Sequence, residues 1–283
     1  MTSVDIDSLR TWIGRNEVRE DTIAATPVVN LLATLDRDDL DVRDGDATPP
    51  LAHWLYFLPL YRTEDAGPDG HAKRGGFLPP VPLPRRMWAG GRLEFRDTLR
   101  IGDRATKRST IADVSLKQGR AGPLVFVLVR HEIATARGVA LIEEHDIVYR
   151  EAPLPGETPA APIAAPPDAA WRRVVTPSAL LLFRYSALTF NGHRIHYDRR
   201  YVTEVEGYPG LVVHGPLMAT LLLDLVRRER PDARIGRFVF RAVRPVFDVA
   251  PFQLCGAPEG GAARLWVADA QGALAMEGRA ELD

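Results

Sequence analysis

Apolar and polar residues along the chain form two similar series of strand-like runs, and each series follows a helix-like segment. The runs span 92–119, 123–138 and 139–151 in one series, and 234–261, 263–272 and 273–282 in the other. Within each series the runs meet at glycine-bearing turns, such as "IGD", "GRAG" and "ARG" in the first. This arrangement predicts antiparallel strands rather than the strand–helix alternation of a parallel sheet.

The segment "GPLMATLLLDLVRRERP" at 215–231 predicts the helix of the second series. It is apolar almost all round, has Pro216 near its first turn and basic residues in its last, and meets Pro231 as a stop. A helix that is apolar on every side is buried, so we expect a sheet to wrap around it. The segment "TPVVNLLATLDRDDL" at 26–40 is the weaker counterpart ahead of the first series. The predicted fold class is α+β, with one helix-then-sheet unit occurring twice.

Proline and alanine dominate the segment "EAPLPGETPAAPIAAPPDAAW" at 151–171. Proline neither donates to a sheet ladder nor continues a helix, so we interpret this segment as a linker. The predicted organisation is an N-terminal domain at 1–152, a Pro/Ala-rich linker at 153–170 and a C-terminal domain at 171–283, which holds the second series of strands.

The composition narrows the class of protein. The 283 residues are 46% apolar and 26% charged, with a net charge of −1, which gives no electrostatic reason to expect nucleic acid or a membrane as a partner. No apolar run approaches the ~20 residues of a membrane span, and the N-terminus lacks the pattern of a secretory signal, so we expect a cytoplasmic location. The single cysteine, Cys255, rules out a disulfide within the chain, and its apolar surroundings predict burial.

Two histidines, His193 and His196, stand three residues apart in "RYSALTFNGHRIHYDRRY" at 184–201, directly after an Asn-Gly pair that favours a turn. Three interpretations compete: a metal site, an acid–base site, or ordinary loop residues. The spacing alone supports a metal site only weakly, and the sequence offers no evident third ligand. An imidazole has a pKa near ~6.5 and so exchanges a proton close to neutral pH, which suits acid–base chemistry.

A helix wrapped by a long antiparallel sheet is the hotdog arrangement, and the histidine segment resembles a motif of that fold. MaoC-like enoyl-thioester hydratases carry Asp-x-Asn-Pro-x-His followed by a His-Gly segment, and "NGHRIH" and "VVHGPLMATLL" stand in those places. "RYSALTFNGHRIHYD" is similar to the hydroxyacyl-thioester dehydratase type 2 branch. "PPLAHWLYFLPL" and "KRGGFLPPVPLPRRMWAGG" resemble the 3-methylfumaryl-CoA (mesaconyl-C4-CoA) hydratases. The resemblance implies a double hotdog, with two helix-wrapped antiparallel sheets in one chain.

The resemblance also assigns roles to single residues. The catalytic histidine of the family falls on His196, whereas its catalytic aspartate falls on Asn191, which is a departure. The Asn-Pro pair of the family falls on His193 and Arg194. The glycine whose backbone N–H binds the thioester oxygen falls on Gly215, where a helix start stabilises developing negative charge.

The departure at Asn191 changes the expected chemistry. An asparagine cannot take up a proton, so the base role moves to His196 and the amide is expected to orient a water. His193 is then a candidate orienter or second acid. His214, just before the predicted helix, is a candidate for a contact near the thioester or for a capping role. Asp198 lies close enough in sequence to fix a histidine tautomer.

Substrates of the mesaconyl type carry a free carboxylate, which arginine side chains bind through two parallel hydrogen bonds. Arg85 and Arg86 in "PLPRRMWAGG" are the candidates for this contact, and a surface ion pair is the alternative for both. Tyr185 is a further candidate for a hydrogen bond in the site, although a tyrosine in a helix is more commonly a packing residue. The aromatic residues of "HWLYFLPL" are predicted to pack in the first half of the chain.

The expected activity is that of a hydro-lyase that adds water to an α,β-unsaturated acyl-CoA. The expected reaction is 3-methylfumaryl-CoA to citramalyl-CoA, or hydration of itaconyl-CoA, with the C-terminal domain catalytic and the N-terminal domain supplying a pocket wall. The resemblance implies no metal or other cofactor beyond the acyl-CoA substrate, and a homodimer is left open. The alternatives are dehydration of 3-hydroxyacyl chains on a carrier protein, non-catalytic binding of an acyl thioester, and thioester hydrolysis.

Overall fold

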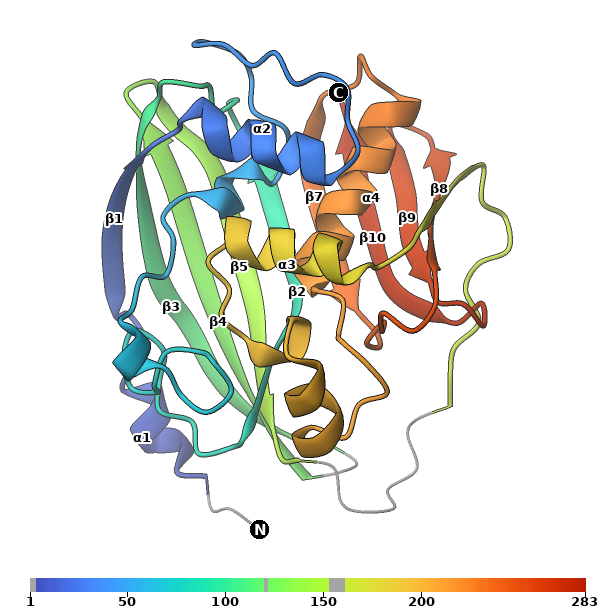
Figure 1. The fold of residues 1–283 in the computed structure, drawn as a ribbon. Coiled ribbons are helices and arrows are strands. Elements are labelled where there is room, and N and C mark those ends of the chain that lie inside the picture. Colours follow the sequence, from blue (N-terminus) through green and yellow to red (C-terminus); the bar gives the residue numbers. More distant parts are fainter. Residues whose placement is uncertain (1–3, 120–121, 153–160) are drawn as a thin grey trace.

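The computed structural model describes residues 4–119, 122–152 and 161–283. In this part of the chain, ten strands form one antiparallel sheet in the order β1-β3-β4-β5-β2-β7-β10-β9-β8-β6 (Figure 1). The strands are β1 (Asn16–Thr22), β2 (Arg85–Phe95), β3 (Arg104–Gly119), β4 (Gly122–Thr135), β5 (Gly138–Arg150), β6 (Trp171–Val175), β7 (Ile235–Ala242), β8 (Phe252–Glu259), β9 (Ala262–Ala268) and β10 (Leu274–Leu282). Five strands come from residues 4–152, called the first half below, and five from residues 161–283, called the second half.

The two halves join where β2 pairs with β7 in the middle of the sheet. The pairing runs in register from Gly90 opposite Arg241 to Glu94 opposite Arg237. A Cβ atom on Gly90 would lie 2.5 Å from the carbonyl oxygen of Phe240, so only glycine allows the two backbones to approach this closely. The sheet is therefore continuous from one half to the other.

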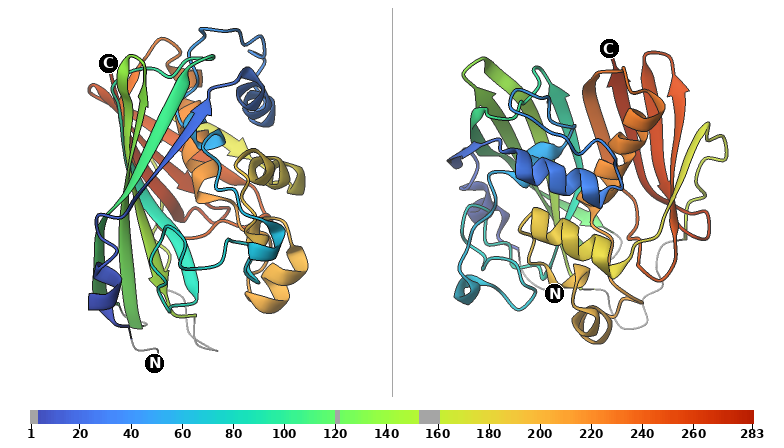
Figure 2. Two further views of the ribbon diagram at one scale, coloured as in Figure 1. Left: turned by 90° about the vertical axis from the view of Figure 1, so that its left-hand side faces the viewer. Right: turned by 45° about the horizontal axis from the view of Figure 1, so that its top comes forward.

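Three helices lie on one face of this sheet (Figure 2). They are α2 (Ala25–Thr34), α3 (Ala179–Leu188) and α4 (Gly215–Glu229), whereas the short α1 (Ile6–Arg10) packs beside β3. Helix α4 is the central element of the second half, and its residues 217–226 are all buried. Each leucine buried in such a core contributes roughly 1.5–3 kcal/mol. The prediction of a buried helix at 215–231 is confirmed, with Pro216 in its first turn and Pro231 just beyond its end.

The prediction that segment 26–40 is the first-half counterpart of this helix is wrong. The segment 26–40 forms α2, which ends at Thr34 and is followed by Asp36 with a positive φ of 56°. By its place after the first strand of its half, α2 corresponds to α3, and these two helices contact each other. Between α2 and β2 the described chain forms only two 3₁₀ turns, η1 (Ala52–Leu55) and η2 (Thr63–Asp65). The described first half thus has no equivalent of α4.

The strands predicted at 92–151 and 234–282 are confirmed, as is the burial of Cys255, which is 1% exposed. The pattern did not reveal β1, β6 or α3. The division into domains stays a prediction, and residues 153–160 of the expected linker lie outside the described residues. None of the helices that the structure describes has the length and apolar character needed to cross a membrane.

Candidate active site

The catalytic turn predicted at 191–196 lies directly after α3. Phe190 has a positive φ of 50°, which reverses the chain, and the N–H of Asn191 donates to the carbonyl of Ser186 at 2.8 Å. The Oδ1 atom of Asn191 accepts from the backbone N–H of His193 at 3.0 Å, the local bond typical of asparagine in a turn. A short 3₁₀ turn, η3 (Arg194–His196), then places His196 against the start of α4. Asn191 thus shapes the turn through its oxygen, which leaves its amide N–H₂ as the group able to contact a water.

His196 is buried and held in one tautomer. It is 7% exposed, and its Nδ1 donates to the carbonyl oxygen of Val212 at 2.7 Å. That bond leaves Nε2 without a hydrogen, as a proton acceptor. Burial lowers the pKa of His196 to about 4, although the hydrogen bond to Val212 opposes the shift. The side chain is therefore neutral at pH 7 and suited to accept a proton from water.

His214 supports His196 from behind. The two rings stack with centroids 3.7 Å apart and an interplanar angle of 17°. His214 is fully buried, and its Nε2 lies 2.8 Å from the hydroxyl of Ser186 on α3. Its Nδ1 has no hydrogen-bond partner among the described residues. The ring is thus enclosed by protein and stacked on His196, and its predicted contact near a thioester stays a prediction.

The start of α4 borders open space beside these two rings. Gly215 is the first residue of the helix, and a Cβ atom placed on it would meet no described atom within 4 Å. The first N–H groups of a helix have no partner within it and carry the positive end of the helix dipole. The role of the Gly215 N–H in stabilising negative charge on a thioester oxygen stays a prediction.

His193 links His196 to two residues of the first half that the sequence analysis did not identify. The rings of His193 and His196 are 5.4 Å apart between centroids, and the rings of His193 and His71 are 4.1 Å apart. The Nδ1 atom of His71 lies 3.1 Å from a carboxylate oxygen of Asp69. Burial, together with neighbouring His71, His196 and Arg86, lowers the pKa of His193 to about 2. The result is a row of side chains from Asp69 through two histidines to His196.

The two candidate arginines have different surroundings. Arg85 forms an ion pair with Glu206 at 3.0 Å and donates to the hydroxyl of Tyr208 at 2.7 Å, so its charge is already engaged. Arg86 has no ion-pair partner among the described residues, and its charge acts on His71 and His193. Arg86 also lies within hydrogen-bond reach of the Tyr149 hydroxyl, so it differs from Arg85 in lacking a carboxylate partner, and its contact with a substrate carboxylate stays a prediction.

Two further sequence candidates are engaged with other protein groups, Tyr185 in the packing role given as its commoner alternative. Tyr185 is buried on α3, and its hydroxyl lies 3.3 Å from that of Thr220, so it packs beneath His214 instead of reaching a ligand. Asp198 binds the guanidinium of Arg194 at 2.8 Å and contacts no histidine among the described residues, which makes its predicted role as a tautomer-fixing carboxylate wrong.

A second polar cluster lies on the face of the first half that is covered by η1. Glu143 on β5 is 0% exposed, and its carboxylate accepts from His53 at 3.0 Å and from the indole N–H of Trp54 at 2.8 Å. His145 lies 2.6 Å from the same carboxylate. Beyond it, His131 lies within 3.3 Å of His145 and within 2.8 Å of the hydroxyl of Ser109. The aromatic residues of "HWLYFLPL" thus pack in the first half as predicted, and His53 and Trp54 of this segment also take part in a buried polar network.

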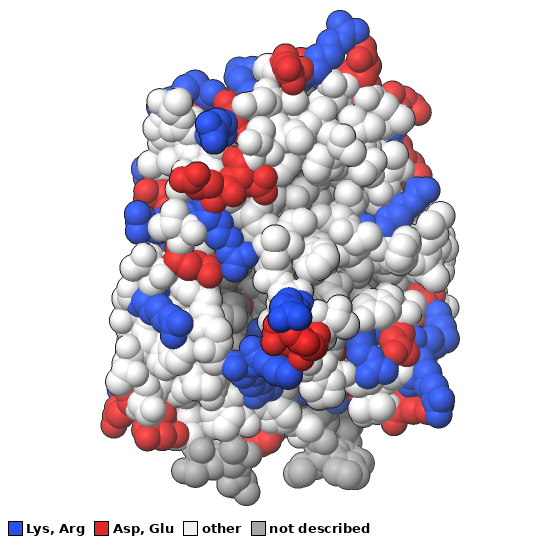
Figure 3. Space-filling model, turned by 60° about the vertical axis from the view of Figure 1, so that its left-hand side comes forward, with Lys and Arg blue, Asp and Glu red and all other residues white. Residues whose placement is uncertain are grey.

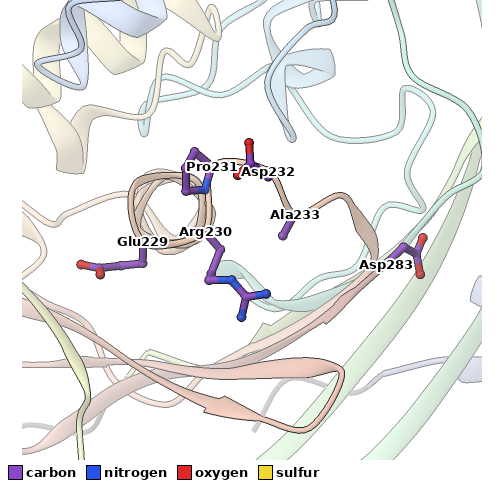
Figure 4. A pocket seen from close by; sticks show the side chains of 6 residues that line it. All are labelled: Glu229, Arg230, Pro231, Asp232, Ala233 and Asp283. Carbon is purple, nitrogen blue, oxygen red and sulfur yellow. The ribbon is translucent and has the colours of Figure 1, made fainter.

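The surface around these sites has mixed charge. Figure 3 shows the face on the side of β1, where basic and acidic side chains alternate and a hollow opens near the middle. A separate depression of about 350 Å³ lies at the far end of α4, lined by Glu229, Arg230, Pro231, Asp232, Ala233 and Asp283 (Figure 4). A 15-residue helix is about 22 Å long, so this depression is remote from the histidines at the other end of α4.

Comparison with known proteins decides the family. The profile of the hydroxyacyl-thioester dehydratase type 2 family matches residues 51–248. The chain is also 47% identical over 275 residues to the mesaconyl-C(4)-CoA hydratase of Chloroflexus aurantiacus, covering 96% of each protein. The chain belongs to the hydroxyacyl-thioester dehydratase type 2 family. Members of this hydro-lyase family act on acyl thioesters, so the chain is an enzyme of the hydratase/dehydratase class.

More distant relatives agree with this assignment. The mitochondrial hydroxyacyl-thioester dehydratase type 2 of Schizosaccharomyces pombe is 28% identical, covering 88% of this chain and 92% of that protein. A MaoC-like dehydratase from Phytophthora capsici has the same fold, with a TM-score of 0.75 at 14% identity, covering 99% of this chain and 98% of the other. A Mycobacterium tuberculosis protein described as having a double hotdog fold matches with a TM-score of 0.58 at 13% identity, covering 98% of each chain. The predicted family and double hotdog fold are confirmed, although the two halves share one ten-stranded sheet instead of forming two, and only the described second half has the central helix.

Proposed function

We propose that this dehydratase-family enzyme hydrates 3-methylfumaryl-CoA (mesaconyl-C4-CoA) to citramalyl-CoA. The observation that carries the reaction type is His196, a buried neutral imidazole with a bare Nε2 that stacks on His214, the residue just before the helix start at Gly215. The identity of 47% to a mesaconyl-C(4)-CoA hydratase supports the substrate. Itaconyl-CoA is the second candidate from the same class of branched dicarboxylic thioesters.

The proposed chemistry uses two groups, the imidazole of His196 and the N-terminus of α4 at Gly215. The Nε2 atom of His196 takes a proton from a water whose oxygen attacks the β-carbon of the enoyl thioester. The electron pair of the double bond moves onto the thioester oxygen, where the N–H of Gly215 and the dipole of α4 stabilise the negative charge. The imidazolium then returns its proton to the α-carbon, so the water adds in full and the enzyme regains its starting state. The amide N–H₂ of Asn191 is the proposed support for the water.

We assign the substrate's free carboxylate to Arg86. Arg86 is half-buried and close to His71 and His193, whereas Arg85 is engaged by Glu206 and Tyr208. An arginine fork binds a carboxylate through two parallel hydrogen bonds, each worth about 1.5–3 kcal/mol when charged. A monocarboxylic enoyl-CoA offers nothing to this side chain. Arg86 therefore separates dicarboxylic from monocarboxylic substrates.

The test is to incubate the enzyme with mesaconyl-C4-CoA or crotonyl-CoA. Two quantities are measured: the loss of the enoyl absorbance and the release of free thiol. The proposal expects loss of absorbance without free thiol and faster turnover of mesaconyl-C4-CoA. Release of thiol would instead identify a thioesterase, and tight CoA binding without either change would identify a binding protein. A preference for an enoyl chain on carrier protein would favour the dehydratase alternative.

The role of Arg86 is tested by the ratio of kcat/KM for the two substrates. In Arg86→Lys this ratio should fall about 10- to 100-fold in favour of crotonyl-CoA, because a point charge does not reproduce the fork. Arg85→Lys should change both substrates alike, since Arg85 contacts Glu206 and Tyr208. An unchanged ratio in Arg86→Lys would remove Arg86 from substrate recognition. A homodimer and a cytoplasmic location stay predictions.

A further inference from the structure

The loop 67–72 of the first half is fixed to the catalytic turn of the second. The backbone N–H of Arg194 donates to the carbonyl of Asp69 at 2.9 Å, and the guanidinium of Arg194 donates to the carbonyl of Pro68 at 2.9 Å. Gly70 and Gly192 touch so closely that a Cβ atom on Gly70 would lie 1.9 Å from the carbonyl oxygen of Gly192. Two glycines at the contact and two hydrogen bonds beside it hold the loop and the turn as one unit.

This fixed loop presents a carboxylate and an imidazole to the histidine row. One oxygen of Asp69 accepts from the backbone N–H of His71 and the other from its Nδ1, both at 3.1 Å. The second bond leaves Nε2 of His71 without a hydrogen. Burial opposes the charged form of Asp69, yet the hydrogen bonds and charge of His71 hold the pKa of this carboxyl well below its usual value. His71 is thus held in the same tautomer as His196, with a carboxylate in place of the Val212 carbonyl.

The carboxylate of Asp69 occupies a role that position 191 leaves vacant. Asn191 has no charge, and Asp198 is bound to Arg194. Of the carboxylates that the structure describes, Asp69 is the one hydrogen-bonded within the row His71–His193–His196. A carboxylate that fixes a histidine tautomer and orients its ring is a recurring device of acid–base sites.

We propose that Asp69 and His71 are a positioning pair for the catalytic turn and replace the carboxylate that Asn191 does not provide. Asp69 fixes His71, and the ring of His71 holds His193 against His196. This inference rests on the proposed hydration reaction. The active site is then built from both halves of the molecule, with the base on the second half and its supporting carboxylate on the first.

The side chains of Asp69, His71 and His193 have ligand atoms within 4.8 Å of one another, so a metal site is the competing explanation. Two observations favour the positioning pair. Both oxygens of Asp69 are already occupied by His71. The positive charge of Arg86 acts on both histidines and would repel a divalent cation.

The decisive variants are Asp69→Asn and His71→Asn. The first removes the charge and permits the other tautomer of His71; the second removes the ring but keeps an amide N–H₂ able to donate to Asp69, so the loop stays in place. Each should lower kcat by about 100- to 10,000-fold with little change in KM. Asp65→Asn, an equal charge change at an exposed position of the preceding turn η2, is the matched control and should retain wild-type kcat.

Two readouts separate positioning from mere structural support. Loss of the Asp69 charge removes the hydrogen bond and the charge that raise the pKa of His71, so the NMR titration of the His71 ring should move to lower pH in Asp69→Asn and stay in place in Asp65→Asn. A downfield proton NMR signal from the Nδ1–H of His71 should disappear in Asp69→Asn. If His71→Asn unfolds at the wild-type temperature and keeps kcat within twofold of wild type, the proposal is overturned.

The remaining outcomes are also informative. Wild-type protein that hydrates no enoyl-CoA would refute the proposed function itself, whereas active wild type with active Asp69→Asn and His71→Asn variants would refute only the positioning pair. Bound metal in stoichiometric amount, lost together with activity on chelation and absent from Asp69→Asn, would replace the positioning pair with a metal centre. Catalysis that survives chelation, together with loss of kcat in both variants, supports the proposal.

Discussion

The two halves of the molecule bury their polar side chains on different layers. In the described first half, three of these lie on the sheet itself: Ser109 on β3, His131 on β4 and Glu143 on β5. In the described second half none lies on a strand. The buried polar residues there are Ser186, His196, His214, Thr220 and Asp224, all in or directly before the helices and the catalytic turn.

The difference follows from what covers each sheet. Helix α4 satisfies its own backbone, and its buried residues 217–226 are apolar except for Thr220 and Asp224, so the buried strand residues beneath it are apolar as well. The first half has the short turn η1 in this region, which brings the polar groups of His53 and Trp54 onto the strands. Glu143 accepts hydrogen bonds from both. A buried polar network thus stands in the first half where the second has α4, and the candidate catalytic histidines lie on the half whose helix provides a positive N-terminus.

Separating the halves should have the largest effect. Residues 161–283 expressed alone should be inactive and poorly soluble, because β7 loses its pairing with β2 and the site loses Asp69 and His71. The measurement is hydration of mesaconyl-C4-CoA by the fragment and by the full chain at equal concentration. Full activity of the fragment, as monomer or dimer, would show that the first half is dispensable.

Removing the base of the second half should nearly abolish catalysis without loss of the fold. His196→Ala should reduce kcat about 100- to 10,000-fold, the usual contribution of a general acid–base group. Circular dichroism and the thermal midpoint should stay close to wild type, which separates this loss from unfolding. Retention of more than about a tenth of wild-type turnover, equal to about 1.4 kcal/mol of barrier, would contradict the assignment.

Removing the centre of the first-half network should affect stability instead. Glu143→Ala leaves His53, Trp54 and His145 without their shared acceptor, and breaking a buried pair in this way costs about 3–5 kcal/mol of unfolding free energy. Glu144→Ala is the matched control, because the carboxylate of Glu144 faces outward and pairs with Arg92. A surface ion pair contributes about 0–1 kcal/mol. Denaturant unfolding measures both. Equal stability of the two variants would mean that the network does not support the first half.

Acid should destabilise the protein through histidines of both halves, with the smallest effect per residue. His131 and His196 are buried with pKa values lowered by burial, so below the unfolded value of about 6.5 the unfolded state binds more protons. Stability is therefore lost as the pH falls, and for His196 the loss is about 2 kcal/mol between pH 7.5 and 5. Chemical denaturation at both pH values should show a smaller loss in His131→Gln and in His196→Gln. A wild-type-sized loss in one variant would mean that the histidine removed does not contribute.

The sequence predicted those features whose signals are local. Alternation revealed the long strands, an apolar run between two prolines revealed α4, and the Asn-Gly pair before His193 revealed the turn that follows α3. The helix expected at 26–40 forms as α2, but its assignment as the counterpart of α4 was wrong. An apolar pattern does not show which helix of the other half a helix corresponds to. The Glu143 network joins residues about 90 positions apart, beyond the reach of any local pattern.

The partners of His193 were missed for a related reason. The segment "GPDGHAKRGG" at 67–76 is rich in glycine but does not stand between a strand and a helix start, as a phosphate-binding loop would. The informative feature of this segment was the Asp-x-His spacing between glycines. Its importance depends on the contact between Gly70 and Gly192, which lies more than 100 residues later in the chain. Arg85 and Arg86 were likewise inseparable in sequence and became distinct only through the pairing of Arg85 with Glu206.

The pairing of β2 with β7 frees the molecule from a constraint that symmetric assemblies carry. In a homodimer the two partners are encoded once, so every substitution appears in both. Here both strands belong to one chain, and dilution cannot separate them. One half can therefore lack this helix and bury Glu143 while the other has α4 and His196. Two identical subunits could not differ from each other in this way.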